Sequence, residues 1–84
     1  MNKEEVYETL RNLGTSIARI TWDRGNGKLD ELVYFDGEFD SEQNPKMYFA
    51  NGRAQLDIKK MGGYSSIISI EEECPDGYCI KRTA

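Results

Sequence analysis

The chain lacks histidine altogether and contains only two prolines, two cysteines and no long apolar run. Histidine is the commonest general base and the commonest metal ligand, so the sequence lacks the residue that most such sites use. A helix that crosses a bilayer needs about 20 apolar residues, and no segment offers them. The first residues, MNKEEVYETL, are charged from the start, unlike a secretion leader, so we expect a cytoplasmic protein.

The remaining polar residues form no catalytic pattern. Ser65, Ser66 and Ser69 have no base partner visible in the sequence, and the glycine stretches RGNG, NGRA and MGGYSS match no phosphate-binding fingerprint. The many Asp and Glu residues leave a carboxylate pair open. A chain of 84 residues has a thin core and little room for a substrate pocket. We predict that the protein is not an enzyme and has no cofactor.

Hydrophobic periodicity predicts one helix at the start of the chain. Its apolar stripe at helical spacing comprises Val6, Leu10 and Leu13. Asn2 is a good N-cap, and Glu5 completes a capping-box pattern. Gly14 is a suitable residue to end the helix. The sequence therefore predicts a helix that begins after Asn2 and stops at Gly14.

The rest of the chain is typical of strands joined by short turns. TSIARITWD alternates, with Ala18, Ile20 and Trp22 on one face, and KLDELVYF returns after the turn RGNG. KMYFA and RAQLDIK flank Asn51-Gly52, which favours a type I′ hairpin turn. SIISI and YCIKR complete the set. We predict a single α+β domain over residues 1–84, with one N-terminal helix packed on an antiparallel sheet of about five to six strands built from hairpins.

Charge is distributed unevenly along the chain, whose net charge is −4. Residues 36–45 carry −4 and residues 71–84 carry −2, whereas residues 46–70 carry +3. The hairpin of KMYFA and RAQLDIK lies in this positive stretch, and we call it the basic hairpin. It is expected to lie apart from the acidic run and to give the molecule a dipole. An acidic protein is repelled by nucleic acid and by anionic membranes, so the expected partner is a basic protein surface.

The run FDGEFDSE places an acid at every second position, and three interpretations of it are open. These acids are Asp36, Glu38, Asp40 and Glu42. They match the first ligand positions of a calcium-binding EF-hand loop, but Ser41 and Met47 occupy the positions that need Gly and Glu. In an extended strand they would form one row of carboxylates about 6.6 Å apart, which could imitate DNA phosphates. The plain alternative is a solvated edge, which such runs usually form.

Two features beside the acidic run bear on partner binding. Phe39 lies between the acids and, in an extended strand, faces away from them, either into the core or onto a partner. A second acidic stretch, EEECPD, contributes further carboxylates. The predicted partner-binding residues are Asp36, Glu38, Phe39, Asp40, Glu42, Glu71, Glu72, Glu73 and Asp76.

The two cysteines, Cys74 and Cys79, flank the turn PDGY. A short hairpin would place them within disulfide reach, although thiols stay reduced in a cytosolic chain. Two cysteines also supply half of a zinc site, which a dimer could complete. Reduced thiols, a disulfide and zinc thus remain open, in that order of expectation, and a small zinc-binding module is one alternative function.

In size, order of elements and charge the chain resembles the small inhibitors of phages and mobile elements, namely the anti-CRISPR, anti-restriction and DNA-mimic proteins. The resemblance consists of one short domain, the helix-then-strands order and the acidic stretches DGEFDSE and EEECPD. ITWDRGNGKLDELVYFDG is also similar to the strand, glycine loop and strand of small phage and plasmid families of unassigned function. These inhibitors share no signature, so no functional residue carries over.

The resemblance and the charge pattern together lead to one expectation. The protein would block a nucleic-acid-handling complex in the host cytoplasm by presenting acidic patches to its basic surface, with no direct nucleic-acid or membrane contact. The alternative from a different class is a self-associating structural or regulatory module, possible as a homodimer, whose exposed strand edges pair between subunits.

Overall fold

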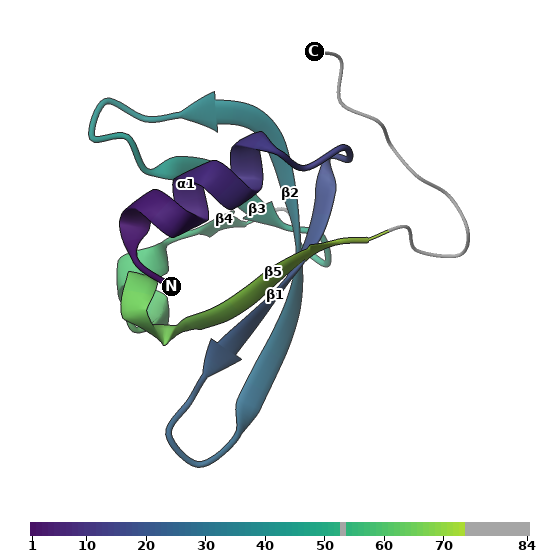
Figure 1. Cartoon of the computed structure of the whole chain (residues 1–84). Coiled ribbons are helices and arrows are strands. Elements are labelled where there is room, and N and C mark those ends of the chain that lie inside the picture. Colours follow the sequence, from purple (N-terminus) through teal and green to yellow (C-terminus); the bar gives the residue numbers. More distant parts are fainter. Residues whose placement is uncertain (53, 74–84) are drawn as a thin grey trace.

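One helix, five strands and two short 3-10 helices make up the regular structure of residues 1–52 and 54–73, which this computed structural model describes (Figure 1). In chain order the elements are α1 (Lys3–Arg11), β1 (Ile17–Asp23), β2 (Lys28–Phe39), β3 (Pro45–Phe49), β4 (Gln55–Leu56), η1 (Ile58–Met61), η2 (Tyr64–Ser66) and β5 (Ile67–Glu72). The predicted α+β fold with an N-terminal helix on an antiparallel sheet is confirmed. The predicted strand YCIKR, both cysteines and Asp76 lie outside the described residues.

The capping box at the start of α1 is confirmed. The Asn2 side chain accepts a hydrogen bond from the backbone nitrogen of Glu5, and the Glu5 carboxylate accepts one from the backbone nitrogen of Asn2. The predicted end at Gly14 is wrong, because α1 stops at Arg11 and Asn12 caps it with φ of −93°. The backbone nitrogen of Gly14 instead donates to the Glu72 carboxylate at the end of β5.

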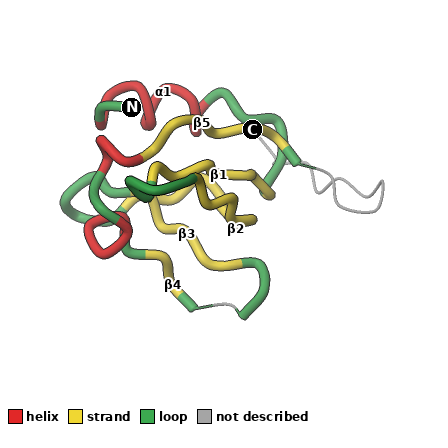
Figure 2. The backbone as a smooth tube through the Cα atoms, turned by 90° about the horizontal axis from the view of Figure 1, so that it is seen from below, coloured by secondary structure: helices red, strands yellow, loops and turns green. Residues whose placement is uncertain are grey.

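The strands form one antiparallel sheet in the order β4-β3-β2-β1-β5. The first four strands follow one another as a meander, and β5 then returns to pair with β1 on its free side. The two 3-10 helices make the connection from β4 to β5. Figure 2 shows the sheet curling, with α1 and β5 on one side of the molecule and β3 and β4 on the other. The concave side of this sheet faces α1 and holds the core.

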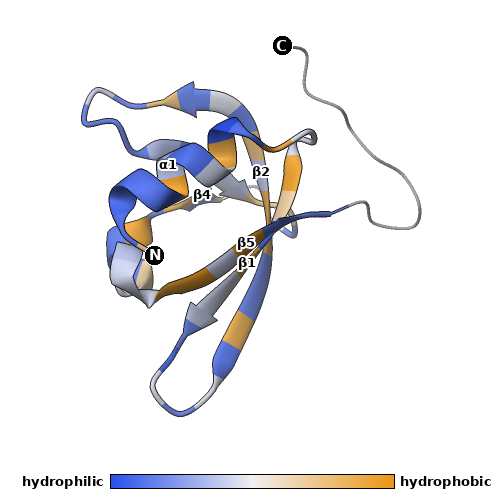
Figure 3. Cartoon of the chain, in the orientation of Figure 1, coloured by the Kyte–Doolittle hydropathy of each residue, from blue (hydrophilic) through white to orange (hydrophobic). Residues whose placement is uncertain are grey.

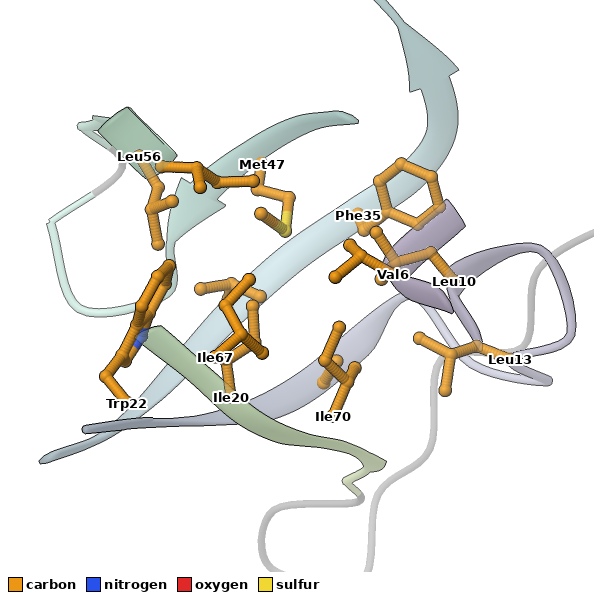
Figure 4. Packing of buried hydrophobic residues seen from close by; sticks show 13 residues of the cluster. Val6, Leu10, Leu13, Ile20, Trp22, Phe35, Met47, Leu56, Ile67 and Ile70 are labelled. Atoms are coloured by element: carbon orange, nitrogen blue, oxygen red, sulfur yellow. The ribbon is translucent and has the colours of Figure 1, made fainter. Parts of the chain in front are cut away.

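The core follows the alternation of the strands. Ala18, Ile20 and Trp22 of β1 are fully buried, as predicted, and β2 adds Val33 and Phe35 from the same side of the sheet. The other buried members of the cluster are Val6, Leu10, Leu13, Met47, Leu56, Ile58, Ile67 and Ile70. Figure 4 shows Trp22 beside Leu56 at one end and Leu13 at the other. Burying one large apolar side chain contributes about 1.5–3 kcal/mol, so this cluster is the main source of stability.

The polarity of the elements agrees with this arrangement. Figure 3 shows β5 as apolar over its first half and hydrophilic towards Glu72. The same figure shows α1 hydrophilic over much of its length, with some apolar bands. Val6 and Leu10 are the buried residues of this helix. Among residues 1–52 and 54–73, no helix has the length and hydropathy that a bilayer span requires.

The hairpin formed by β3 and β4 has the predicted position but a different turn. The backbone nitrogen of Phe49 donates to the carbonyl of Ala54, so these residues face each other as expected. Neither Asn51 nor Gly52 has a positive φ, and the predicted type I′ turn is therefore wrong. Gly52 instead donates from its backbone nitrogen to the carbonyl of Phe49 at 3.4 Å, which places it at the last position of an ordinary β-turn.

Candidate binding surface

The acidic run begins on the last part of β2, where the strand is interrupted by a bulge. Phe35 pairs with Met47 and Phe39 pairs with Pro45, so three residues of β2 face a single residue of β3. Gly37 has φ of 98°, a left-handed conformation that favours glycine. The straight row of carboxylates expected of an uninterrupted strand does not form, because the backbone turns at Gly37.

Beyond β2, Asp40 organises a tight turn. Its Oδ1 accepts hydrogen bonds from the backbone nitrogens of Glu42 and Asn44, both at 2.9 Å. Its own backbone nitrogen donates to the carbonyl of Asn44 at 2.8 Å, and Gln43 takes a positive φ of 65°. The hydrogen bond from the Asn44 backbone is the main cause that lowers the pKa of the Asp40 carboxyl. The Asp40 carboxylate thus stabilises the turn that follows it by accepting two of its backbone hydrogen bonds.

Phe39 turns towards the core and not towards solvent. Its ring lies 4.6 Å from the ring of Tyr7 on α1 and 5.4 Å from the ring of Phe35, measured between centroids. Of the two placements that the sequence leaves open, core and partner, the structure shows the core. Phe39 holds the end of β2 against the helix and thereby fixes where the acidic turn projects.

The other three acids of the run are exposed. The side chain of Glu38 is 65% exposed, and its only described ion pair is with Lys46 at 3.9 Å. Asp36 accepts a hydrogen bond from the backbone nitrogen of Glu38 at 3.3 Å. Near Glu42, the Lys3 ammonium donates to the backbone carbonyl of that residue at 2.9 Å. The carboxylates of Asp36, Glu38 and Glu42 therefore remain accessible to a partner.

A hollow of about 590 Å³ lies between the acidic turn and the segment from β4 to η2. Asp40 and Glu42 line it together with Lys59 and Lys60. The predicted separation of the basic hairpin from the acidic run is therefore wrong, because η1 brings these two lysines to the same hollow as the acids. The other lining residues are Asn44, Pro45, Gln55, Leu56, Asp57, Ile58, Gly63 and Tyr64.

A hydrogen bond ties the acidic turn to the segment across the hollow. The Tyr64 hydroxyl donates to Oδ1 of Asn44 at 2.6 Å. Partial burial, followed by the negative charge of Asp40, raises the pKa of Tyr64, so its hydroxyl stays protonated at neutral pH. The Lys3 ammonium also lies 5.9 Å from the centroid of the Tyr64 ring. These contacts fix the turn relative to the rest of the fold.

The second acidic stretch is engaged within the molecule. Glu72 accepts a hydrogen bond from the backbone nitrogen of Gly14, and Glu73 forms an ion pair with Arg19 at 3.1 Å. The hydrogen bond from Arg19 lowers the pKa of Glu73, and the same contact raises the pKa of Arg19. Glu71 is exposed and lies opposite Arg19 in the β1–β5 register. Asp76, the last predicted site residue, lies outside the described residues.

Within the described ranges, no group of three or more metal-ligating side chains is placed to hold an ion. The calcium interpretation required a loop of twelve residues, whereas the run forms the end of a strand, a bulge and a short turn. Cys74 and Cys79, on which the zinc interpretation depends, lie outside those ranges.

The pair Asn44-Pro45 indicates a turn at the end of the acidic run, but the sequence does not show which side chains shape this surface. Gly37 makes the bulge, and Asn44 and Tyr64 anchor the turn. One signal was available: an Asp followed by Asn-Pro four residues later is typical of a turn in which the Asp side chain accepts backbone hydrogen bonds. The contact of Tyr64 with Asn44 has no local signal, because the two residues are distant in sequence.

No protein-family model matches the chain, and no curated protein sequence or solved structure is significantly similar to it.

Proposed function

We propose that this chain is a small non-enzymatic binding protein of the inhibitor type found in phages and mobile elements. It blocks a nucleic-acid-handling host protein by placing carboxylates in the basic groove that nucleic acid would occupy. The observation that carries the proposal is the exposure of Asp36, Glu38 and Glu42 on a segment whose backbone is fixed by a bulge and a capped turn.

Charge and shape both suit the acidic run to a basic groove. Arginine and lysine bind carboxylates and phosphates through the same charge-assisted hydrogen bonds, so a basic groove accepts either. A DNA backbone winds as it advances, and a bent arrangement of acids therefore suits such a groove as well as a straight one does. The net charge of −4 speeds the encounter with a basic partner.

Rigidity strengthens the argument. Asp40 caps the turn, Phe39 packs on Tyr7 and Asn44 is bound to Tyr64, so the segment is ordered before any partner arrives. A binding segment that is already in its bound shape loses less conformational entropy on association. Exposed acids on such a segment support a role in recognition better than acids on a loose loop would.

The test uses the wild-type protein as bait for bacterial lysate, followed by a DNA-displacement assay on each captured protein. The double variant Asp36→Lys/Glu38→Lys should bind the captured protein about tenfold or more weakly, since each exposed charge pair contributes up to about 1 kcal/mol. Its affinity should also depend less on salt concentration. The measurement is a titration at two salt concentrations.

A matched control separates position from net charge. Glu4→Lys/Glu8→Lys on α1 makes the same change in net charge at exposed positions outside the acidic run. The proposal expects it to weaken binding much less. Equal loss in both double variants, or a captured protein that still binds DNA at saturating inhibitor, would contradict the proposal.

A further inference from the structure

The convex side of the sheet, opposite α1, is covered by no helix of the described residues (Figure 2). Val33 and Phe35 of β2 point into the core, so Tyr34 between them points outward. Ile17 and Tyr48 are the cross-strand partners of Tyr34, and Leu32 and Glu71 are the partners of Arg19, so these side chains share one side of the sheet. We name as the outer face Arg19, Leu32, Tyr34, Asp36, Tyr48 and Glu71.

The centre of the outer face is aromatic. Tyr34 lies on the central strand of the sheet and is 37% exposed, which makes it one of two exposed large apolar residues in the described part of the chain. Tyr48 and Leu32 lie beside it and are half-buried. Tyrosine in the middle of a surface with a polar rim is typical of protein–protein interfaces, where it often provides much of the binding energy.

The rim of the outer face is acidic. Asp36 follows Tyr34 by two residues and is exposed, and Glu71 is exposed on β5. Two cations on this side, Arg19 and Lys46, are already paired, the first with Glu73 at 3.1 Å and the second with Glu38 at 3.9 Å. A third acid, Asp30, accepts a hydrogen bond from Thr21 at 2.8 Å and adds to the negative charge on the same side. The surface around Tyr34 therefore attracts a cationic group.

We infer that the partner docks on the outer face and presents an arginine side chain to Tyr34 and Asp36. This inference rests on the proposed function, in which the partner is a basic protein. Residues two apart on a strand are about 6.6–6.8 Å apart on one face, so one guanidinium can stack on the Tyr34 ring and reach the Asp36 carboxylate. Lysine has neither the flat group for stacking nor the paired donors, so the site distinguishes arginine from lysine.

The experiment uses two probes of equal charge, octa-arginine and octa-lysine, titrated into the isotope-labelled full chain and followed by amide NMR shifts. Octa-arginine should bind about three- to fivefold more tightly, the factor expected of stacking at an exposed ring. The largest shifts should occur at residues 32–36 and 47–49. Equal affinity for both peptides, or shifts confined to the turn 40–44 and α1, would overturn the inference.

Substitutions at the ring make the test specific. Tyr34→Ala should remove the preference for octa-arginine, whereas Tyr34→Phe, which keeps the ring, should retain it. The amide spectrum of each variant shows directly whether it is folded, and Tyr34→Phe carries the test if Tyr34→Ala is not. Sedimentation at the same concentrations checks for a second copy: a dimer that Tyr34→Ala dissociates would overturn the arginine partner in favour of self-association.

The two proposals fail in different ways. If the wild-type chain prefers octa-arginine at Tyr34 but displaces no DNA from any captured protein, the proposed function is wrong and the outer face still binds arginine. If displacement depends on Asp36 and Glu38 but is unchanged in Tyr34→Ala, the proposed function stands and docking on the outer face is wrong.

Discussion

The two acidic segments of this chain, residues 36–42 and 71–73, look alike in sequence and differ in what their carboxylates do. In the segment 71–73, Glu72 binds the backbone of Gly14 and Glu73 binds Arg19. In the segment 36–42, one carboxylate of four, that of Asp40, caps its own turn, and the other three stay exposed. The carboxylates of Asp36 and Glu38 make only longer contacts, at 3.3 and 3.9 Å, and stay exposed to a partner.

The difference has a geometric cause. Residues 71–73 end a strand that is paired with β1, which places them against Arg19 and the loop after α1. Residues 36–39 form the bulged end of β2, and residues 40–42 make a turn beyond it. One segment thus holds the last strand in place, and the other projects from the sheet. The comparison predicts that loss of the Glu72 or Glu73 carboxylate affects stability and that loss of the Asp36, Glu38 or Glu42 carboxylate affects binding.

The largest effect on stability should come from a substitution in the β2 bulge, at Gly37. Gly37→Ala forces a side chain into φ of 98° and should lower the free energy of unfolding by about 1–2 kcal/mol. Gly52→Ala is the matched control, because Gly52 has no positive φ and nothing lies within 4 Å of an added Cβ. Urea unfolding of both variants measures the difference. Equal losses would show that the bulge places no special demand on its glycine.

A smaller effect should distinguish two neighbouring acids at the end of β5. Glu73→Gln removes the charge that faces Arg19 and should lower the midpoint of thermal unfolding, whereas Glu71→Gln should leave it nearly unchanged. The difference should shrink in high salt, because the pair is partly exposed and is screened. If the two variants unfold at the same temperature, the segment 71–73 is no more structural than the segment 36–42.

The smallest effect concerns pH. Hydrogen bonds from Asn44 and Glu42 lower the pKa of Asp40, so its stabilising contribution is complete above the usual value of about 3.9 and is lost as pH falls through the folded-state pKa. Asp40→Asn should therefore reduce stability at pH 7 and have little effect near pH 2. Urea unfolding of both proteins at the two pH values is the measurement, and a pH-independent difference would contradict this role.

Local signals in the sequence sufficed for much of the fold. Asn2 and Glu5 lie three residues apart, so the capping box is visible without tertiary information. The alternation of Ala18, Ile20 and Trp22 identifies the buried side of β1 for the same reason. The helix, the order of the first four strands and much of the core follow from such patterns.

The site depended on contacts that no local pattern contains. The capped turn brings Asn44 to Tyr64, and η1 brings Lys59 and Lys60 to the hollow beside Asp40. The expected dipole between the acidic run and the basic hairpin was wrong for this reason: charge summed along the chain does not say which segments meet. The engagement of Glu73 could not be predicted either, because it needs β5 to pair with β1.

The pairing of β5 with β1 also affects how the chain folds during its synthesis. Ala18 pairs with Glu72, and Ile20 pairs with Ile70. The second edge of β1 therefore stays uncovered during synthesis until β5 has left the ribosome. Until then the meander of β1 to β4 presents an open edge next to apolar side chains, the arrangement that invites pairing with other chains. Contacts between such distant residues also slow folding. The sheet therefore closes only after β5 has left the ribosome.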